Sequence, residues 1–129
     1  GPAARAWYET ERTLSEHAPG RTRINLEAIK DSRRPLPSTP FIEAHYFQND
    51  CFMRPDQLMA DIGKLRGIPA IVIQGRTDFL CPPSTSHALA AVWPDADIRI
   101  VEGAGHSLYD PGIKDAIMLA VENLELFRL

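Results

Sequence analysis

The sequence lacks any apolar run that approaches the roughly 20 residues of a membrane-spanning helix, and it shows no secretory signal peptide. It has only two cysteines, too few for a disulfide framework and without the spacing of metal ligands. Its four histidines also lack the spacing of a metal site. We therefore expect a cytoplasmic protein that needs no membrane, metal or cofactor.

The sequence also lacks a concentrated basic face. Its 14 Lys and Arg residues are scattered, the net charge is −3, and acidic residues flank the densest basic run, from Arg21 to Arg34. Nucleic-acid surfaces need clustered basic residues, so we expect no nucleic-acid partner. The hydrophobic fraction of 44% and charged fraction of 24% instead suit an ordinary globular domain.

Two regions of the chain differ in composition and in hydrophobic pattern. Residues 1–66 are polar and interrupted by prolines, and they contain no strand-like run. Their composition and breakers predict short helices over residues 3–16, 26–32, 41–50 and 57–64.

From Ile68 onward the pattern becomes β-α-β-α. A continuous apolar, β-branched run predicts a buried parallel strand over residues 69–74, and residues 97–101 are predicted as a second strand. The helix between them, residues 84–93, has Ser84 as a candidate N-cap. A final helix shows one apolar stripe, formed by Ile113, Ile117, Val121 and Leu124. Two parallel strands alone cannot form a sheet that is buried on both faces, so we expect the chain to be part of a larger fold. The alternative is that residues 1–66 form the missing layer.

Two titratable side chains follow the two predicted strands. Asp78 comes three residues after the glycine that ends the first strand, and His106 comes directly after Gly103-Ala-Gly105. Catalytic groups of open α/β sheets gather beyond the carboxyl ends of strands, so adjacent strands would bring the two together. A carboxylate that accepts from the histidine Nδ1–H fixes its tautomer and stabilises the imidazolium. Either residue alone is commonly a turn or structural residue, but their order and spacing favour a catalytic pair.

The sequence supplies no nucleophile for this pair. In α/β-hydrolases the serine stands in a G-x-S-x-G turn upstream of the acid. None of the six serines has glycine at both positions; Ser107 has Gly105 before it but Tyr109 after it. Cys51 also lacks such a turn. The chain alone is therefore predicted to be inactive by this route.

Several longer motifs point to one family. They are Ile68 to Pro82, which includes Gln-Gly-Arg-x-Asp-x-x-Cys-Pro, Ala91 to Ala96 with its Trp-Pro, and Gly103 to Ser107. Upstream, Ala3 to Trp7 and the run Glu43-Ala-His-Tyr-Phe47 extend the match. With these motifs the sequence resembles the C-terminal part of the proline iminopeptidases, α/β-hydrolases that remove N-terminal proline from peptides.

The resemblance implies the last two parallel strands of an α/β-hydrolase with flanking helices (residues 67–129), preceded by part of a helical cap (residues 1–66). It implies that Asp78 and His106 belong to a Ser–His–Asp triad whose serine lies in a missing N-terminal segment. Glu11 and Glu43 would receive the free amino group of a peptide substrate with an N-terminal proline. Cys81 would be a thiol near the pocket.

Two departures and two alternatives accompany this interpretation. Thr10 stands where the family usually has tryptophan, and Cys51 stands where it has glycine. Fold does not determine function, so another α/β-hydrolase such as an esterase stays open. So does a non-catalytic chain that binds partners, or forms a homo-oligomer, through the surface that the missing half would cover.

Overall fold

Two parallel strands organise the second half of the chain. In the computed structural model, which describes residues 1–16 and 23–123, they are β1 (Ala70–Gly75) and β2 (Ala96–Val101). Their register runs from Ala70 opposite Ala96 to Gly75 opposite Val101, so both strands end at the same level. The two predicted strands are confirmed to within one residue.

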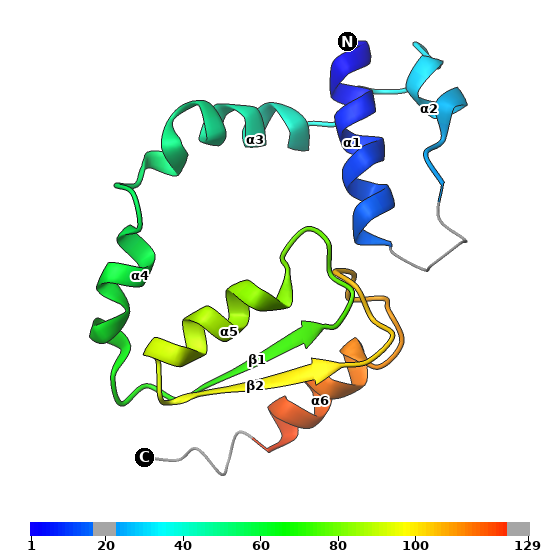
Figure 1. Cartoon of the computed structure of the whole chain (residues 1–129). Helices are drawn as coiled ribbons and strands as arrows, with labels where there is room; N and C mark the ends of the chain where they lie inside the picture. The colour runs from blue at the N-terminus through cyan, green and yellow to red at the C-terminus, as the bar shows by residue number, and fades with distance from the viewer. Residues whose placement is uncertain (17–22, 124–129) are drawn as a thin grey trace.

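One helix lies on each side of this strand pair (Figure 1). Helix α5 (Pro83–Val92) joins the strands, and α6 (Ile113–Glu122) follows β2. The predicted N-cap of α5 is wrong: Pro82 caps the helix, and its carbonyl accepts from the Thr85 N–H at 2.9 Å. Pro83 can take the first helical position because that N–H would have no helical partner.

The apolar stripe of α6 faces β1. Ile113 is buried, and Ile117 and Val121 line a groove together with Ile71 and Ile73 of the strand. The fourth predicted member of the stripe, Leu124, lies outside the described residues.

The first half of the chain is helical, as its composition predicted, and curves away from the strand pair before returning to it (Figure 1). Helix α1 (Pro2–Ser15) packs against α2 (Leu26–Lys30) and α3 (Thr39–Gln48). The predicted helix over residues 57–64 is α-helical only at its start and continues as a 3₁₀ turn. No described helix is both long and apolar enough to cross a membrane. The elements are α1 (Pro2–Ser15), α2 (Leu26–Lys30), α3 (Thr39–Gln48), η1 (Asp50–Phe52), α4 (Gln57–Asp61) and η2 (Ile62–Leu65).

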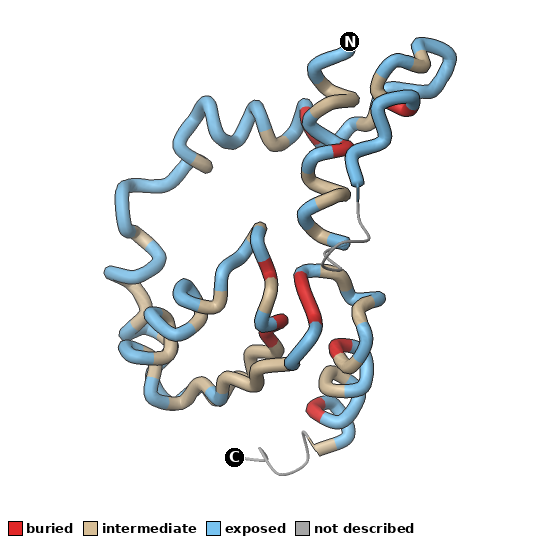
Figure 2. The backbone as a smooth tube through the Cα atoms, turned by 45° about the vertical axis from the view of Figure 1, so that its right-hand side comes forward, coloured by how far each residue is buried: buried red, intermediate tan, exposed pale blue. Residues whose placement is uncertain are grey.

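Buried residues gather at the carboxyl ends of the strands and along α6, whereas the helical curve is largely exposed (Figure 2). The central residues of β1, Ile71, Val72 and Ile73, are only half-buried, so the prediction of a buried first strand is wrong for this structure. The reason is that two strands offer each other one edge and leave the other open, and one helix covers each face incompletely. Such a layer fits within a larger α/β fold.

Candidate active site

The loops after β1 and β2 are held together by backbone contact. A Cβ atom on Gly75 would stand 2.0 Å from the Gly105 carbonyl oxygen and 2.7 Å from that of Ala104, so only glycine fits. The Thr77 N–H and hydroxyl both donate to the Ala104 carbonyl, at 2.9 and 3.0 Å. The two strand ends are thereby fixed relative to one another.

Asp78 lies in the first of these loops with its carboxylate buried; the residue is 8% exposed. Its Oδ1 accepts from the backbone N–H groups of Leu80 and Cys81, at 2.9 and 2.8 Å. Two donors on one oxygen set the plane of the carboxylate. The other oxygen, Oδ2, is left to face the second loop.

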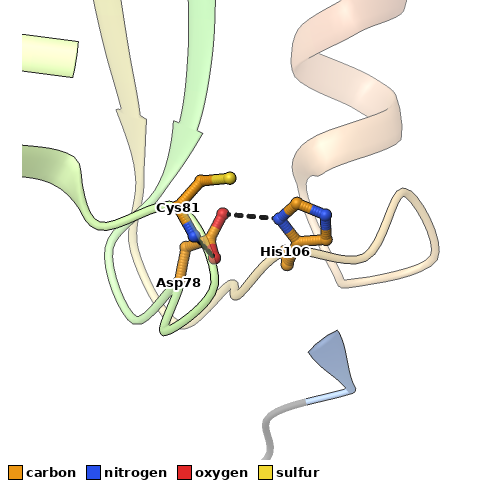
Figure 3. A group of neighbouring side chains, drawn as sticks. All are labelled: Asp78, Cys81 and His106. Carbon is orange, nitrogen blue, oxygen red and sulfur yellow. Dashed lines mark hydrogen bonds and ion pairs between the residues drawn. The ribbon is translucent and has the colours of Figure 1, made fainter. Parts of the chain in front are cut away.

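His106 meets this free oxygen. Its Nδ1 lies 3.0 Å from Asp78 Oδ2, and the histidine side chain is 42% exposed (Figure 3). Behind it, Ala104 is fully buried and the Gly105 N–H donates to Asp110 Oδ2 at 2.6 Å. The ring is held at Nδ1, and no described serine hydroxyl hydrogen-bonds to Nε2.

Glu43 and Glu11 lie side by side, although they come from α3 and α1. Burial, followed by a hydrogen bond and charge repulsion from Glu11, raises the pKa of Glu43, and a hydrogen bond with the Trp7 side chain lowers it by less. Glu43 Oε2 is buried and accepts no hydrogen bond from any residue that the structure describes. An unpartnered buried acceptor beside a second carboxylate favours a cation as the ligand of this pair.

One cavity connects the glutamate pair with the histidine. Its volume is about 440 Å³, and both Glu11 and Glu43 line it together with His106. The structure therefore brings the four predicted site residues to one place: Asp78 contacts His106, and His106 shares a cavity with the glutamates. Their roles in catalysis and substrate binding stay predictions.

Some residues at this site were not anticipated from the sequence. Tyr8 and Tyr109 also line the cavity, and Asp110 anchors the Gly105 N–H. Asp110 carries no local signal, because it accepts from an N–H five residues earlier in the chain. The two tyrosines carry no local signal, since only tertiary packing puts them beside the cavity.

Cys81 lies next to the Asp78–His106 pair, near the cavity as the resemblance implied. Loss of water around the thiol, and then the charge of Asp78, raises its pKa. Cys51 lies elsewhere, in η1 with a left-handed backbone, and both thiols are free. Nothing in the structure gives Cys51 a role.

The parallel strand pair, its flanking helices and the acid and histidine that follow the strands define part of an α/β-hydrolase. No family model matches the chain. Across almost its whole length, however, the chain is similar to the C-terminal part of proline iminopeptidases.

Three of these relatives illustrate the extent of the match. The proline iminopeptidase of Neisseria meningitidis serogroup B is 34% identical over 95% of this chain and 37% of its own length. That of Arabidopsis thaliana is 36% identical, over 95% of this chain and 32% of its own length. That of Xylella fastidiosa is 34% identical, over 94% and 38%. The chain thus spans about a third of the length of these curated relatives.

Proposed function

We propose that the chain is the C-terminal part of a serine aminopeptidase that releases N-terminal proline from peptides. One observation carries the proposal: a single cavity is lined both by His106, which contacts the Asp78 carboxylate, and by the paired carboxylates Glu11 and Glu43. A histidine for acyl transfer and an anionic site for an amino group are two of the parts that such a reaction needs, beside the serine. The names of the relatives agree with this reaction.

In the proposed chemistry, a serine from outside this chain attacks the carbonyl carbon of the N-terminal proline. His106 Nε2 takes the serine proton and then gives it to the leaving amine, and water afterwards hydrolyses the acyl-enzyme. Asp78 accepts from Nδ1–H throughout, which holds Nε2 as the basic nitrogen. No metal or cofactor takes part in this scheme.

Glu11 and Glu43 are proposed to bind the substrate's amino group. The protonated amine of an N-terminal proline has two N–H donors, and the pair offers two carboxylates, of which Glu43 has a buried oxygen without a described partner. A buried ammonium must be paired to offset its loss of hydration. The pair would therefore select peptides with a free N-terminus.

The proposal includes a division of the chain, with residues 1–66 in the later part of a helical cap and residues 67–129 in the hydrolase core. It also includes inactivity of the chain alone, because none of its serines stands in a G-x-S-x-G turn. Two free thiols are consistent with a cytoplasmic setting.

A chimera tests the proposal. The matching segment of the Neisseria meningitidis relative is replaced by this chain, and hydrolysis of prolyl-anilide is compared with that of N-acetylprolyl-anilide. The chimera should cleave the first and not the second. Glu43→Gln should remove this preference for a free amine, whereas Glu27→Gln, on an exposed side chain, should leave it unchanged.

Other outcomes would replace the proposal. A chimera that hydrolyses simple esters, and whose preference for a free amine survives Glu43→Gln, would indicate an esterase-like enzyme. A folded chimera without turnover would favour a non-catalytic chain. A fluorophosphonate probe should not label the 129-residue chain alone, and labelling would contradict the absence of an activated serine.

A further inference from the structure

Three donor atoms of different chemistry meet where β1 and β2 end. They are a carboxylate oxygen of Asp78, the thiol sulfur of Cys81 and a ring nitrogen of His106, and all lie within 4.8 Å of one another (Figure 3). Among the residues that the structure describes, no other group of three such side chains comes together. Cys81 has no part in the proposed aminopeptidase reaction, so that reaction does not explain why a thiol lies beside the acid–histidine pair.

The loop that carries two of these donors is fixed before any ligand arrives. The Cys81 N–H donates to Asp78 Oδ1, and the Cys81 carbonyl accepts from Gln74 Nε2 at 3.1 Å. Gln74 is buried, and the Ser86 hydroxyl donates to its side-chain oxygen. Because Oδ1 is occupied by backbone donors, Oδ2 is the oxygen that faces His106. Such outer contacts are what orient the ligands of metal sites.

The donors are also accessible from solvent. Cys81 is an exposed residue and the His106 side chain is 42% exposed, so an ion can enter and keep a water molecule. Sulfur, nitrogen and oxygen donors suit Zn²⁺, which takes four ligands, whereas Mg²⁺ and Ca²⁺ prefer oxygen alone. We propose that Asp78, Cys81 and His106 form a binding site for Zn²⁺, with water as the fourth ligand, and that the bound ion is an inhibitor.

Inhibition follows from where metal binding leaves the proton of the His106 imidazole. Binding requires a thiolate and an unprotonated Nδ1, so the thiol proton leaves to solvent and the imidazole proton resides on Nε2. Thiolate and carboxylate together balance the charge of the ion. An Nε2 that carries a proton donates and cannot accept one, so His106 could not act as a general base. Only this inhibitory consequence rests on the proposed function; the binding itself does not.

Binding is tested on the 129-residue chain with Co²⁺ as a visible substitute for Zn²⁺. The chain should bind one equivalent, give the intense visible bands of four-coordinate Co²⁺ and show a thiolate-to-cobalt charge-transfer band. Cys81→Ser should abolish the charge-transfer band and weaken Zn²⁺ binding, measured by calorimetry, at least ~10-fold, since losing even a residue that only hydrogen-bonds to a metal ligand weakens metal binding by about that much. Cys51→Ser, which removes the other thiol, is the matched control and should change neither.

The site is disproved if the chain binds no Co²⁺ saturably, or if the charge-transfer band survives Cys81→Ser. It is also disproved if Cys51→Ser abolishes that band. Circular dichroism of each variant separates loss of a ligand from loss of the fold.

The same variants applied to the chimera described above test inhibition. Zn²⁺ should suppress hydrolysis of prolyl-anilide reversibly, and Cys81→Ser should raise the half-inhibitory concentration at least ~10-fold while leaving the metal-free rate unchanged. Unaltered inhibition in Cys81→Ser would disprove the inhibitory role. An inactive chimera whose chain still gives the cobalt spectrum would refute the aminopeptidase proposal and leave the metal site standing.

Discussion

The two halves of the chain are stabilised differently. In the sheet half, residues 67–123, backbone atoms of the two loops touch, and the Asp78–His106 contact lies directly beyond them. In the helical half, residues 1–16 and 23–66, large apolar side chains such as Phe41 and Phe47 are more than half exposed. The acid–histidine contact therefore depends on one local backbone arrangement, whereas the glutamate pair depends on how α1 packs on α3.

This difference suggests which changes should matter most. The acid–histidine contact should survive almost any change in the helical half and fail when the loops beyond the strands are disturbed. The glutamate pair should respond to changes in charge more than to changes in local backbone.

The largest expected effect is on catalysis. In the chimera, Asp78→Asn should lower kcat for prolyl-anilide by about 10⁴-fold, because an amide neither holds the required His106 tautomer nor stabilises the imidazolium. Asp97→Asn is the matched control, since Asp97 forms only an exposed ion pair with Arg99, and it should leave kcat unchanged. A loss smaller than tenfold in Asp78→Asn would contradict the assigned role of the pair.

The next effect is on stability in the sheet half. Gly75→Ala should lower the free energy of unfolding by ~4 kcal/mol or more, because the added methyl group would overlap the Gly105 carbonyl and force the loops apart. Gly63→Ala introduces the same methyl group where no atom lies within 4 Å, and it should have little effect. Urea unfolding of the two variants measures the difference, and equal midpoints would show that the loop contact is not close.

Helix α6 offers a smaller contrast within one element. Ile113→Ala should lower the free energy of unfolding by ~2–3 kcal/mol, because it leaves a cavity at a buried position. Leu119→Ala, on the exposed side of the same helix, should cost less than ~0.5 kcal/mol. Thermal unfolding of both variants tests whether Ile113 belongs to the core, and a reversed order would place the core on the other face of α6.

The smallest effect concerns the helical half and depends on pH. The pKa of Glu43 is raised in the folded chain above its ordinary value of 4.5, so its protonated form favours the fold and its carboxylate disfavours it. The stability that the protonated form contributes is fully present below pH 4.5 and is lost as pH rises through the raised pKa. Water that reaches the cavity screens the pair, so the change is modest.

Glu43→Gln should therefore be more stable than the wild-type chain at neutral pH and nearly equal to it at low pH. Urea unfolding across this range measures the difference, with Glu27→Gln as the control on an exposed side chain. A difference independent of pH would show that folding does not raise the pKa of Glu43.

Much of the fold and site was predictable because the signals are local. The apolar run before Gly75 and the β-branched residues just ahead of Gly103 marked the strands, and the positions of Asp78 and His106 soon after them indicated that they would meet. Predictions from composition alone were weaker. Ser84 was the wrong N-cap, since Pro83 could already occupy the first turn, and the left-handed backbone of η1 carried no recognisable signal.

The sequence by itself determined the order of elements, the acid and histidine beyond the two strands, and the lack of a nucleophile turn, because each depends on residues close together in the chain. Only the tertiary structure decided which carboxylate oxygen faces Nδ1, and that Glu11 and Glu43 meet in the cavity that His106 lines. It also decided that the Cys81 sulfur lies beside the pair. The physical reason is that contacts between distant segments depend on strand register and helix packing, which short sequence patterns do not encode.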